Sequence, residues 1–331
     1  MNKCLITGAE GFIGSHLADF LLEKGWDVSV SVYADIKNIR HLEGRINILT
    51  CDIRDKDRVD EIIKEIKPDY VFHLAAQSLV VPSWQNTKET LDTDILGTYH
   101  VLDAIKTTGL NPLVIVACSS AEYGLNYSNE IPVTETKEFR PSSPYGIGKI
   151  GTDMFAYLYW QAYGMRIIRV RPFNITGPRK VSDACSDFAR GIIAVENGLT
   201  KILDVGNLNT IRDITDFRDG LKAIWLLAEK GKPGEVYNIC RGRGYRMEDV
   251  LQEFISCANS PIRTRQVSGK MRLLDDAVQI GDNSKLCSLG WEPGISLQKT
   301  VADILNYWRS LTQQDVKLGK CLLGNKISQE T

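Results

Sequence analysis

Apolar residues follow two different spacings along the first half of the chain. Short runs of adjacent apolar residues, typical of strands buried on both faces, alternate with longer segments whose apolar residues recur three or four positions apart, typical of helices. Such alternation predicts parallel strands with helices on both faces of the sheet. The first predicted helix carries Ile13, Leu17, Phe20 and Leu21 and stops at Gly25. The predicted strands cover residues 4–7, 28–32, 46–50, 70–74, 113–117 and 166–171.

The pattern predicts an α/β fold. We expect a Rossmann-like doubly wound parallel sheet over residues 1–173 and a smaller C-terminal α/β substrate lobe over residues 174–310. After Pro172 the apolar segments become shorter, and segments near 213–240 and 280–290 are expected to return to the large domain. Residues 311–331 show no clear period and are predicted to form a loosely attached tail.

Composition narrows the range of partners. The 331-residue chain has 40 basic and 41 acidic side chains, so no net field favours nucleic acid or a membrane, and neither is an expected partner. No apolar stretch approaches the roughly 20 residues of a membrane helix, and no secretory signal is visible. The eight cysteines include no C-x-x-C pair, and the four histidines show no zinc-site spacing. We therefore expect a cytoplasmic protein with reduced thiols and no metal site.

Three glycines follow the first predicted strand. Gly8, Gly11 and Gly14 form G-x-x-G-x-x-G between that strand and the first helix. Glycine permits a tight turn and lets a pyrophosphate approach the backbone, while the helix N-terminus attracts the anion. The spacing alone also occurs by chance in plain connections. Its position between a strand and a helix favours dinucleotide binding.

The choice between NAD and NADP depends on the residues after the second strand. Val32 and Tyr33 stand where NAD-selective proteins offer a carboxylate to the ribose 2′-hydroxyl. Asp35 comes slightly later, whereas Lys37 and Arg40 suit a 2′-phosphate and tilt the expectation toward NADP. The alternative is that all three are solvated loop charges.

A serine, a tyrosine and a lysine form the candidate catalytic group. Tyr145 and Lys149 lie four residues apart at the start of a segment with helical spacing, so they share a helix face. An ammonium beside a phenol lowers its pKa, and a positive nicotinamide adds to this effect. Ser119 follows a buried strand, where a hydroxyl reaches the ligand crevice, although capping a turn is its alternative role. Tyr33 and Lys37 match the same spacing but have no such hydroxyl upstream. We predict hydride-transfer chemistry at Ser119, Tyr145 and Lys149.

These motifs make the chain similar to the extended short-chain dehydrogenase/reductase family of the NAD-dependent epimerase/dehydratase type, over residues 1 to about 310. Through residues 205–213 and 234–240 the second half most resembles the GDP-4-keto-6-deoxy-D-mannose reductases, then the GDP-mannose 4,6-dehydratases. The motifs that carry the resemblance are Thr7-Gly8-x-x-Gly11-x-x-Gly14, His73-Leu74-Ala75-Ala76, Ser119-Ser120-Ala121-Glu122-Tyr123-Gly124, Tyr145-x-x-x-Lys149, Arg171-Pro172-Phe173-Asn174 and Arg212-Asp213-x-x-Asp216.

The resemblance implies further roles. Asn174 and Arg212 would hold the substrate diphosphate, because an arginine fork suits phosphate oxygens; the alternative for Arg212 is a surface ion pair with Asp213 or Asp216. Asp52 would lie near the cofactor adenine. A homodimer is implied through the helix near 89–106 and the helix that begins at Tyr145. The implied cofactor contacts are Gly8, Gly11, Phe12, Ile13, Gly14, Asp52, Ile53, Leu74, Ala75, Ala76, Tyr145 and Lys149. The implied substrate contacts are Ser120, Glu122, Asn174, Arg212, Arg272 and Asp275, the last two near the substrate ribose.

Two positions depart from the family pattern. Ala121 occupies the position where the dehydratases, and often the reductases, carry glutamate, so the carboxylate that removes the C5 proton is missing there. Glu122 is one residue further on, and an extended segment would point it to the opposite side. Asp94 stands where the family usually has asparagine.

The leading hypothesis is an NAD(P)H-dependent reductase of a 4-keto-6-deoxy sugar nucleotide, with GDP as the favoured nucleotide, in deoxysugar biosynthesis. The second is a nucleotide-sugar 4,6-dehydratase or epimerase, in which tightly bound NAD(P) is reduced and reoxidised within one turnover. The third is a non-catalytic cofactor-sensing protein, which would be free to lose the tyrosine or lysine that this chain retains.

Overall fold

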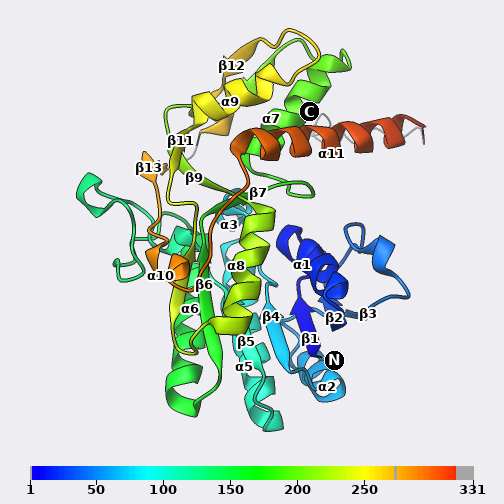
Figure 1. Ribbon diagram of the computed structural model, residues 1–331, viewed down its shortest axis with the longest axis vertical. Helices are drawn as coiled ribbons and strands as arrows, with labels where there is room; N and C mark the ends of the chain where they lie inside the picture. Colours follow the sequence, from blue (N-terminus) through cyan, green and yellow to red (C-terminus); the bar gives the residue numbers. More distant parts are fainter. Residues whose placement is uncertain (1, 272–273, 318–331) are drawn as a thin grey trace.

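The computed structural model describes residues 2–271 and 274–317. Two units make up the molecule: a large parallel sheet flanked by helices, and a smaller lobe of short strands and helices at one end (Figure 1). The predicted α/β fold with a Rossmann-like sheet is confirmed.

Seven parallel strands form the large sheet, in the order β10-β6-β5-β4-β1-β2-β3. Strand β1 lies between β2 and β4, so the chain order reverses on either side of it. A reversal of this kind opens a crevice beyond the carboxyl ends of the strands, where ligands bind. The strands are β1 (Lys3–Thr7), β2 (Asp27–Val32), β3 (Asn47–Thr50), β4 (Tyr70–His73), β5 (Leu113–Ala117), β6 (Ile167–Pro172) and β10 (Val236–Ile239).

Helices cover both faces of this sheet, which explains the uninterrupted apolar runs in its strands. On β1, Cys4 and Ile6 pack into the core cluster that contains α1 and α8, whereas Leu5 packs into the cluster on the other face, with α2, α5 and α6. The two-residue period of a strand thus fills two cores at once. These helices are α1 (Phe12–Glu23), α2 (Lys56–Ile66), α5 (Gly97–Thr108), α6 (Pro144–Tyr163) and α8 (Phe217–Lys230).

The smaller lobe is built on strand β9 (Ile211–Asp216), which pairs with β7 (Asn174–Thr176), β11 (Gly244–Arg246) and β13 (Val278–Gln279). A separate pair joins β8 (Leu203–Val205) to β12 (Thr264–Gln266). Helices α7 (Ala184–Glu196), α9 (Met247–Ser256) and α11 (Leu297–Lys317) complete this lobe (Figure 1). Shorter elements are α3 (Val80–Gln85), α4 (Thr87–Leu91), a π-helix at Asp92–Leu96, α10 (Ser284–Cys287), and 3₁₀ helices at Arg40–Leu42, Ser120–Glu122, Ser128–Glu130 and Ser268–Lys270.

The chain crosses between the two units more than once. After β9 of the lobe it enters α8 and β10 of the large sheet, and α10 later packs against β10. Helix α11 continues to Lys317, so the expected start of a tail at residue 311 falls inside a helix. Within residues 2–271 and 274–317, no helix is both long and apolar enough to cross a membrane.

Asp213 ties the lobe to the large domain. Its carboxylate, completely buried on β9, accepts hydrogen bonds from the backbone amides of Arg241 at 2.7 Å, Gly242 at 2.9 Å and Gly281 at 3.3 Å. Burial raises the pKa of Asp213 to about 6, against the lowering effect of these amides. One side chain therefore fixes the segments that follow β10 and β13.

Replacing Asp213 with alanine should destabilise the fold strongly, because three inward-facing amides lose their acceptor. Each unsatisfied buried group costs about 1–3 kcal/mol, so we expect the free energy of unfolding to fall by about 3 kcal/mol or more in urea titrations. Asp204→Ala is the matched control, because Asp204 pairs with Arg265 on the exposed edge of the lobe and should matter little. Equal losses in the two variants would contradict this account.

Candidate active site

The glycine-rich turn lies directly beyond β1. Gly8 has φ +71°, which favours glycine, and a Cβ built there would lie 2.7 Å from the backbone of Ala75 after β4. A Cβ on Gly14 would lie 2.4 Å from the carbonyl oxygen of Gly8, and one on Gly11 3.2 Å from it. Side chains are thus excluded at Gly8 and Gly14, where the turn before α1 packs directly against neighbouring backbone. The residues fit a dinucleotide diphosphate.

A buried chain of hydrogen bonds leads from this turn toward helix α6. The Thr7 hydroxyl accepts from the amides of Leu74 and Ala75, both at 3.2 Å, and lies 2.9 Å from Nδ1 of His73. Nε2 of His73 lies 3.0 Å from the Thr98 hydroxyl, which donates to the carbonyl oxygen of Asp94 at 2.6 Å. Burial lowers the pKa of His73 to about 3, so its ring is neutral. Every donor in this series of hydrogen bonds has an acceptor when Thr7 donates to Nδ1 of His73 and the His73 ring donates from Nε2 to Thr98.

Ser119, Tyr145 and Lys149 meet at the carboxyl end of β5. Tyr145 and Lys149 lie on the first turns of α6, and a side-chain hydrogen bond joins Tyr145 to Ser119. Lys149 Nζ donates to the carbonyl oxygen of Ala117 at 2.8 Å. Ser119 also caps the 3₁₀ helix that follows it by accepting from the amide of Ala121 at 3.1 Å. The capping role considered for Ser119 is therefore observed, and its catalytic role stays a prediction. Tyr33 and Lys37, the other pair with this spacing, lie outside any helix.

The charges around Tyr145 oppose one another. Burial raises the pKa of the Tyr145 phenol above its ordinary value, although the Lys149 ammonium and the Ser119 hydrogen bond lower it. Burial lowers the pKa of Lys149, but Asp94 and Tyr145 outweigh it and leave that pKa raised. The lysine is thus charged and the phenol protonated at neutral pH. In the protein alone, burial exceeds the acidifying effect that the sequence argument gave to Lys149, and the phenol is suited to donate a proton.

Asp94 is a charged group behind this site. It lies in the π-helix, is 1% exposed, and accepts from the amide of Gln77 at 2.7 Å through Oδ1. Its Oδ2 has no hydrogen-bond partner among the described residues and faces Gly148, where a Cβ would come within 2.9 Å of it. Burial raises the pKa of Asp94 to about 6, against the lowering effects of Lys149 and the Gln77 amide.

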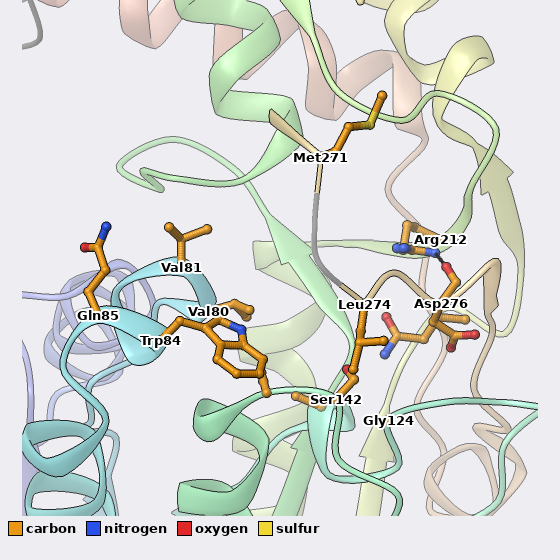
Figure 2. Close-up of a pocket in the computed structure, with 13 residues that line it drawn as sticks. Val80, Val81, Trp84, Gln85, Gly124, Ser142, Arg212, Met271, Leu274 and Asp276 are labelled. Carbon is orange, nitrogen blue, oxygen red and sulfur yellow. Dashed lines mark hydrogen bonds between the residues drawn. The ribbon is translucent and has the colours of Figure 1, made fainter. Parts of the chain in front are cut away.

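A cavity of about 380 Å³ opens between α3 and the small lobe, and its lining includes Ala121 and Ser143, close in sequence to the candidate catalytic residues Ser119 and Tyr145. Figure 2 shows Val80, Val81 and Trp84 on one side, with Arg212 and Asp276 on the other. The charged side chains that line it, within the described residues, are those of Arg212 and Asp276. The complete lining is Val80, Val81, Trp84, Gln85, Ala121, Gly124, Ser142, Ser143, Arg212, Met271, Leu274, Asp276 and Gln279.

Some of the residues expected to bind substrate line the cavity, and others do not. Arg212 lines the cavity and pairs with Asp275 at 2.7 Å, rather than with Asp213 or Asp216. Asn174 and Ser120 lie behind the wall, where each contacts the side chain of Gln279, at 3.2 Å and 3.3 Å. Arg272 lies outside the described residues.

Glu122 is not at the cavity, which corrects its expected place among the substrate contacts. Its side chain is completely buried, accepts from the amide of Ser119 at 2.7 Å, and lies 3.2 Å from the Arg171 guanidinium. Asp153 bridges Arg171 and Arg169 in the same cluster, at 3.0 Å and 2.7 Å. Burial raises the pKa of Glu122 strongly, which the Arg171 charge opposes. The physical reason is the 3₁₀ helix Ser120–Glu122, in which adjacent side chains point about 120° apart, so that Ala121 lines the cavity while Glu122 points inward.

The expected cofactor contacts lie along the same edge of the sheet. Gly8, Gly11, Phe12, Ile13 and Gly14 form the turn after β1, and Leu74, Ala75 and Ala76 follow β4. Asp52 and Ile53 follow β3, where Arg54 holds the Asp52 carboxylate through Nε at 3.0 Å and Nη2 at 2.7 Å. That bond lowers the pKa of Asp52.

Sequence reasoning missed the α3 side of the cavity. The run from Leu79 to Trp84 comes directly after the Ala75–Ala76 loop at the carboxyl edge of the sheet, where ligands bind. An apolar run at that edge was the available signal. Ser83 fixes it, because its hydroxyl accepts from the amide of Tyr145 at 3.1 Å.

Comparison with known proteins agrees with this geometry. The model of the GDP-mannose 4,6 dehydratase family matches residues 5–304. The chain belongs to this family. It is 27% identical to GDP-6-deoxy-D-mannose reductase of Pseudomonas aeruginosa over 95% of this chain and 99% of that protein. It is 31% identical to GDP-mannose 4,6-dehydratase of Vibrio cholerae over 92% of this chain and 93% of that protein. The sequence-based family assignment is confirmed.

Solved structures show the same fold. RMD from Pseudomonas aeruginosa, complexed with NADPH, has a TM-score of 0.82 at 26% identity and covers 94% of this chain and 100% of its own. UDP-glucuronic acid 4-epimerase from Bacillus cereus, in complex with UDP-glucuronic acid and NAD, has a TM-score of 0.84 at 26% identity, covering 93% and 99%. Neighbours of this chain thus bind a nicotinamide cofactor of either kind.

The raised pKa of Asp94 predicts a pH-dependent stability. The pKa of Asp94 is about 6 in the folded protein and near 3.8 in the unfolded chain. Ionised Asp94 therefore lowers the stability of the fold above pH 6, and this loss disappears below about pH 4, where the group is protonated in both states. Asp94→Asn should raise the free energy of unfolding by about 3 kcal/mol near pH 8, with the gain shrinking below about pH 6 and vanishing near pH 4.

Urea titrations of both proteins across this pH range measure the difference. Asp52→Asn is the control, and it should change stability in the opposite direction. Because Arg54 stabilises the ionised Asp52 side chain and lowers its pKa, loss of that charge should lower the free energy of unfolding at neutral pH. An Asp94→Asn effect that does not vary with pH would contradict the assignment.

Proposed function

We propose that the protein reduces a 4-keto-6-deoxy sugar nucleotide by hydride transfer from a nicotinamide cofactor. A GDP-linked sugar is the favoured substrate. The observation that carries this proposal is the placement of Ala121. It lines the cavity where the family carries a glutamate, while Glu122 is held inward by Arg171. A reduction needs a proton donor and no separate base, which fits a cavity that has Tyr145 beside it and no carboxylate at position 121.

The mechanism follows from the charges of the chain's own residues. The bound cofactor supplies the hydride. Tyr145, protonated because burial raises its pKa, donates its proton to the sugar carbonyl oxygen, and Ser119 bonds the same oxygen. Lys149, kept charged by Asp94, stabilises the phenolate that remains. Arg212 lies across the cavity and would hold the substrate diphosphate, with Asn174 supporting the same wall through Gln279.

The competing function is a 4,6-dehydratase or an epimerase, in which the cofactor is reduced and reoxidised within one turnover. Relatives of this chain include enzymes with both of these names. Net consumption of NADH or NADPH with a GDP-4-keto-6-deoxy sugar, one per product, would support the reductase. Conversion of GDP-mannose with loss of water, seen by mass spectrometry without net cofactor consumption, would support the dehydratase. A thermal-shift panel of GDP, UDP, CDP and dTDP tests the nucleotide, because the preferred ligand raises the melting temperature most.

Tyr145→Phe should lower kcat by about 10² to 10⁴-fold, because general acid catalysis contributes that much, and should leave cofactor affinity unchanged. Turnover is followed by the absorbance of the reduced cofactor, and affinity by calorimetry. Tyr163→Phe, at the exposed end of the same helix, is the matched control and should retain full turnover. Persistent turnover in Tyr145→Phe would exclude this tyrosine as the proton donor.

The sequence positions of Lys37 and Arg40 favoured NADP as the cofactor. Their side chains in the structure give that preference little support. Both side chains are exposed, and Arg40 lies 3.9 Å from Asp35, a distance at which two solvated charges interact weakly. The seven cysteines that the structure describes are all free thiols, which supports a reducing compartment such as the cytoplasm.

A homodimer through α6 is the proposed assembly. Ile147, Met154 and Leu158 lie on one face of α6 and are 50%, 40% and 51% exposed. Large apolar side chains gathered on a helix surface mark an interaction site, and two copies of α6 with the adjoining α5 would cover each other.

Leu158→Arg should convert the dimer to a monomer, because the interface would then bury an unpaired charge. Light scattering after size-exclusion chromatography measures the mass. Leu199→Arg, an exposed leucine of the small lobe, should leave the mass unchanged. A wild-type protein that elutes as a monomer would rule out the proposed assembly.

A further inference from the structure

The end of β2 lacks the carboxylate that normally reads the cofactor ribose. Val32 is buried and Tyr33 offers a phenol, while Asp35 lies further along an exposed loop and faces Arg40. In dinucleotide-binding folds, an acidic side chain at this strand end accepts the ribose 2′-hydroxyl and repels a 2′-phosphate. By sequence position alone, this chain has no such group.

In space, a carboxylate is present there. Glu10, in the glycine-rich turn between Gly8 and Gly11, reaches across to β2, and its Oε1 accepts from the backbone amide of Tyr33 at 2.7 Å. Its backbone carbonyl accepts from the Asn38 side chain at 2.8 Å, so the loop after β2 is closed onto the turn. Its Oε2 is shielded from solvent and has no hydrogen-bond partner within the described residues.

We propose that Glu10 is the ribose-reading carboxylate of this protein and that it selects NAD(H) over NADP(H). The inference rests on the nicotinamide dependence of the proposed function. The adenosine ribose of a bound dinucleotide lies between the diphosphate cradle and the end of β2. Glu10 occupies that boundary, with one oxygen fixed by Tyr33 and the other available to a ribose hydroxyl.

The basic groups nearby do not offset this carboxylate. Arg54 is committed to Asp52, and its Nη1 lies 3.5 Å from Glu89. Lys37 and Arg40 are exposed, so their charges are largely screened by water. A 2′-phosphate would place two negative charges beside Glu10 without a dedicated cationic partner.

Binding measurements test the proposal independently of turnover. Calorimetry with NADH and NADPH on the wild-type protein should give a dissociation constant about tenfold or more lower for NADH, as expected for a hydrogen bond to a charged group. Glu10→Gln keeps the acceptor for the Tyr33 amide but removes the charge, and should bring the two constants within about threefold. Asp35→Asn removes a carboxylate from the same loop at an exposed position and should leave the ratio of the two constants unchanged.

The outcomes separate the possible failures. Tighter binding of NADPH by the wild-type protein would overturn the role of Glu10 while leaving the reductase proposal intact, and this comparison needs no variant to fold. Equal weakening of both dinucleotides in Glu10→Gln would show that Glu10 has a purely structural role. An effect of Asp35→Asn on the ratio as large as that of Glu10→Gln would show that any negative charge near the ribose has the same influence. Either result overturns the proposal. Binding of neither dinucleotide would defeat the proposed function itself.

Discussion

One directed series of buried hydrogen bonds holds the glycine-rich turn after β1 and helix α6 in a fixed relation. Thr7 at the end of β1 accepts two amides and can only donate onward to His73, whose ring must then donate to Thr98. Thr98 and Thr152 both donate to the carbonyl oxygen of Asp94, and Thr152 belongs to α6. A neutral imidazole is the one state of His73 that satisfies every link. The two ends of the crevice are thereby positioned together.

The chemistry of the site depends on which charges reach the cavity and which are withheld from it. Behind Ser119, two acidic side chains and two guanidiniums gather in a buried cluster of Glu122, Asp153, Arg169 and Arg171. Lys149 and Asp94 are also buried, and each charge shifts the pKa of the other group in favour of its ionised form. Removing a charge from water is costly unless an opposite charge is near, and each of these buried cations has a carboxyl group near it. The carboxyl end of β5 thus presents a phenol and a hydroxyl, and the carboxylate in the described lining of the cavity is that of Asp276, on the side of the small lobe.

The sequence was sufficient for features that depend on local periodicity. The order of strands and helices through β6, the bare turn at Gly8 and the helical pairing of Tyr145 with Lys149 all follow from spacing of three, four or two residues. Features that depend on distant contacts were not accessible. The pairing of Arg212 with Asp275 and the reach of Glu10 to Tyr33 each join residues from different elements. Nothing in their sequence neighbourhoods specifies those partners, and helix α11 likewise extends past the point where its period fades.

The path of the chain through β10 has a consequence for how such proteins can diversify. This edge strand of the large sheet is reached only after the chain has built β7, β8 and β9 of the lobe, and later residues return to that edge through α10. The lobe is therefore not an appendage that a single recombination event could exchange. A graft made at one junction near β7 would leave the recipient sheet with a foreign edge strand, so an exchange of the lobe that keeps β10 needs junctions on both sides of that strand.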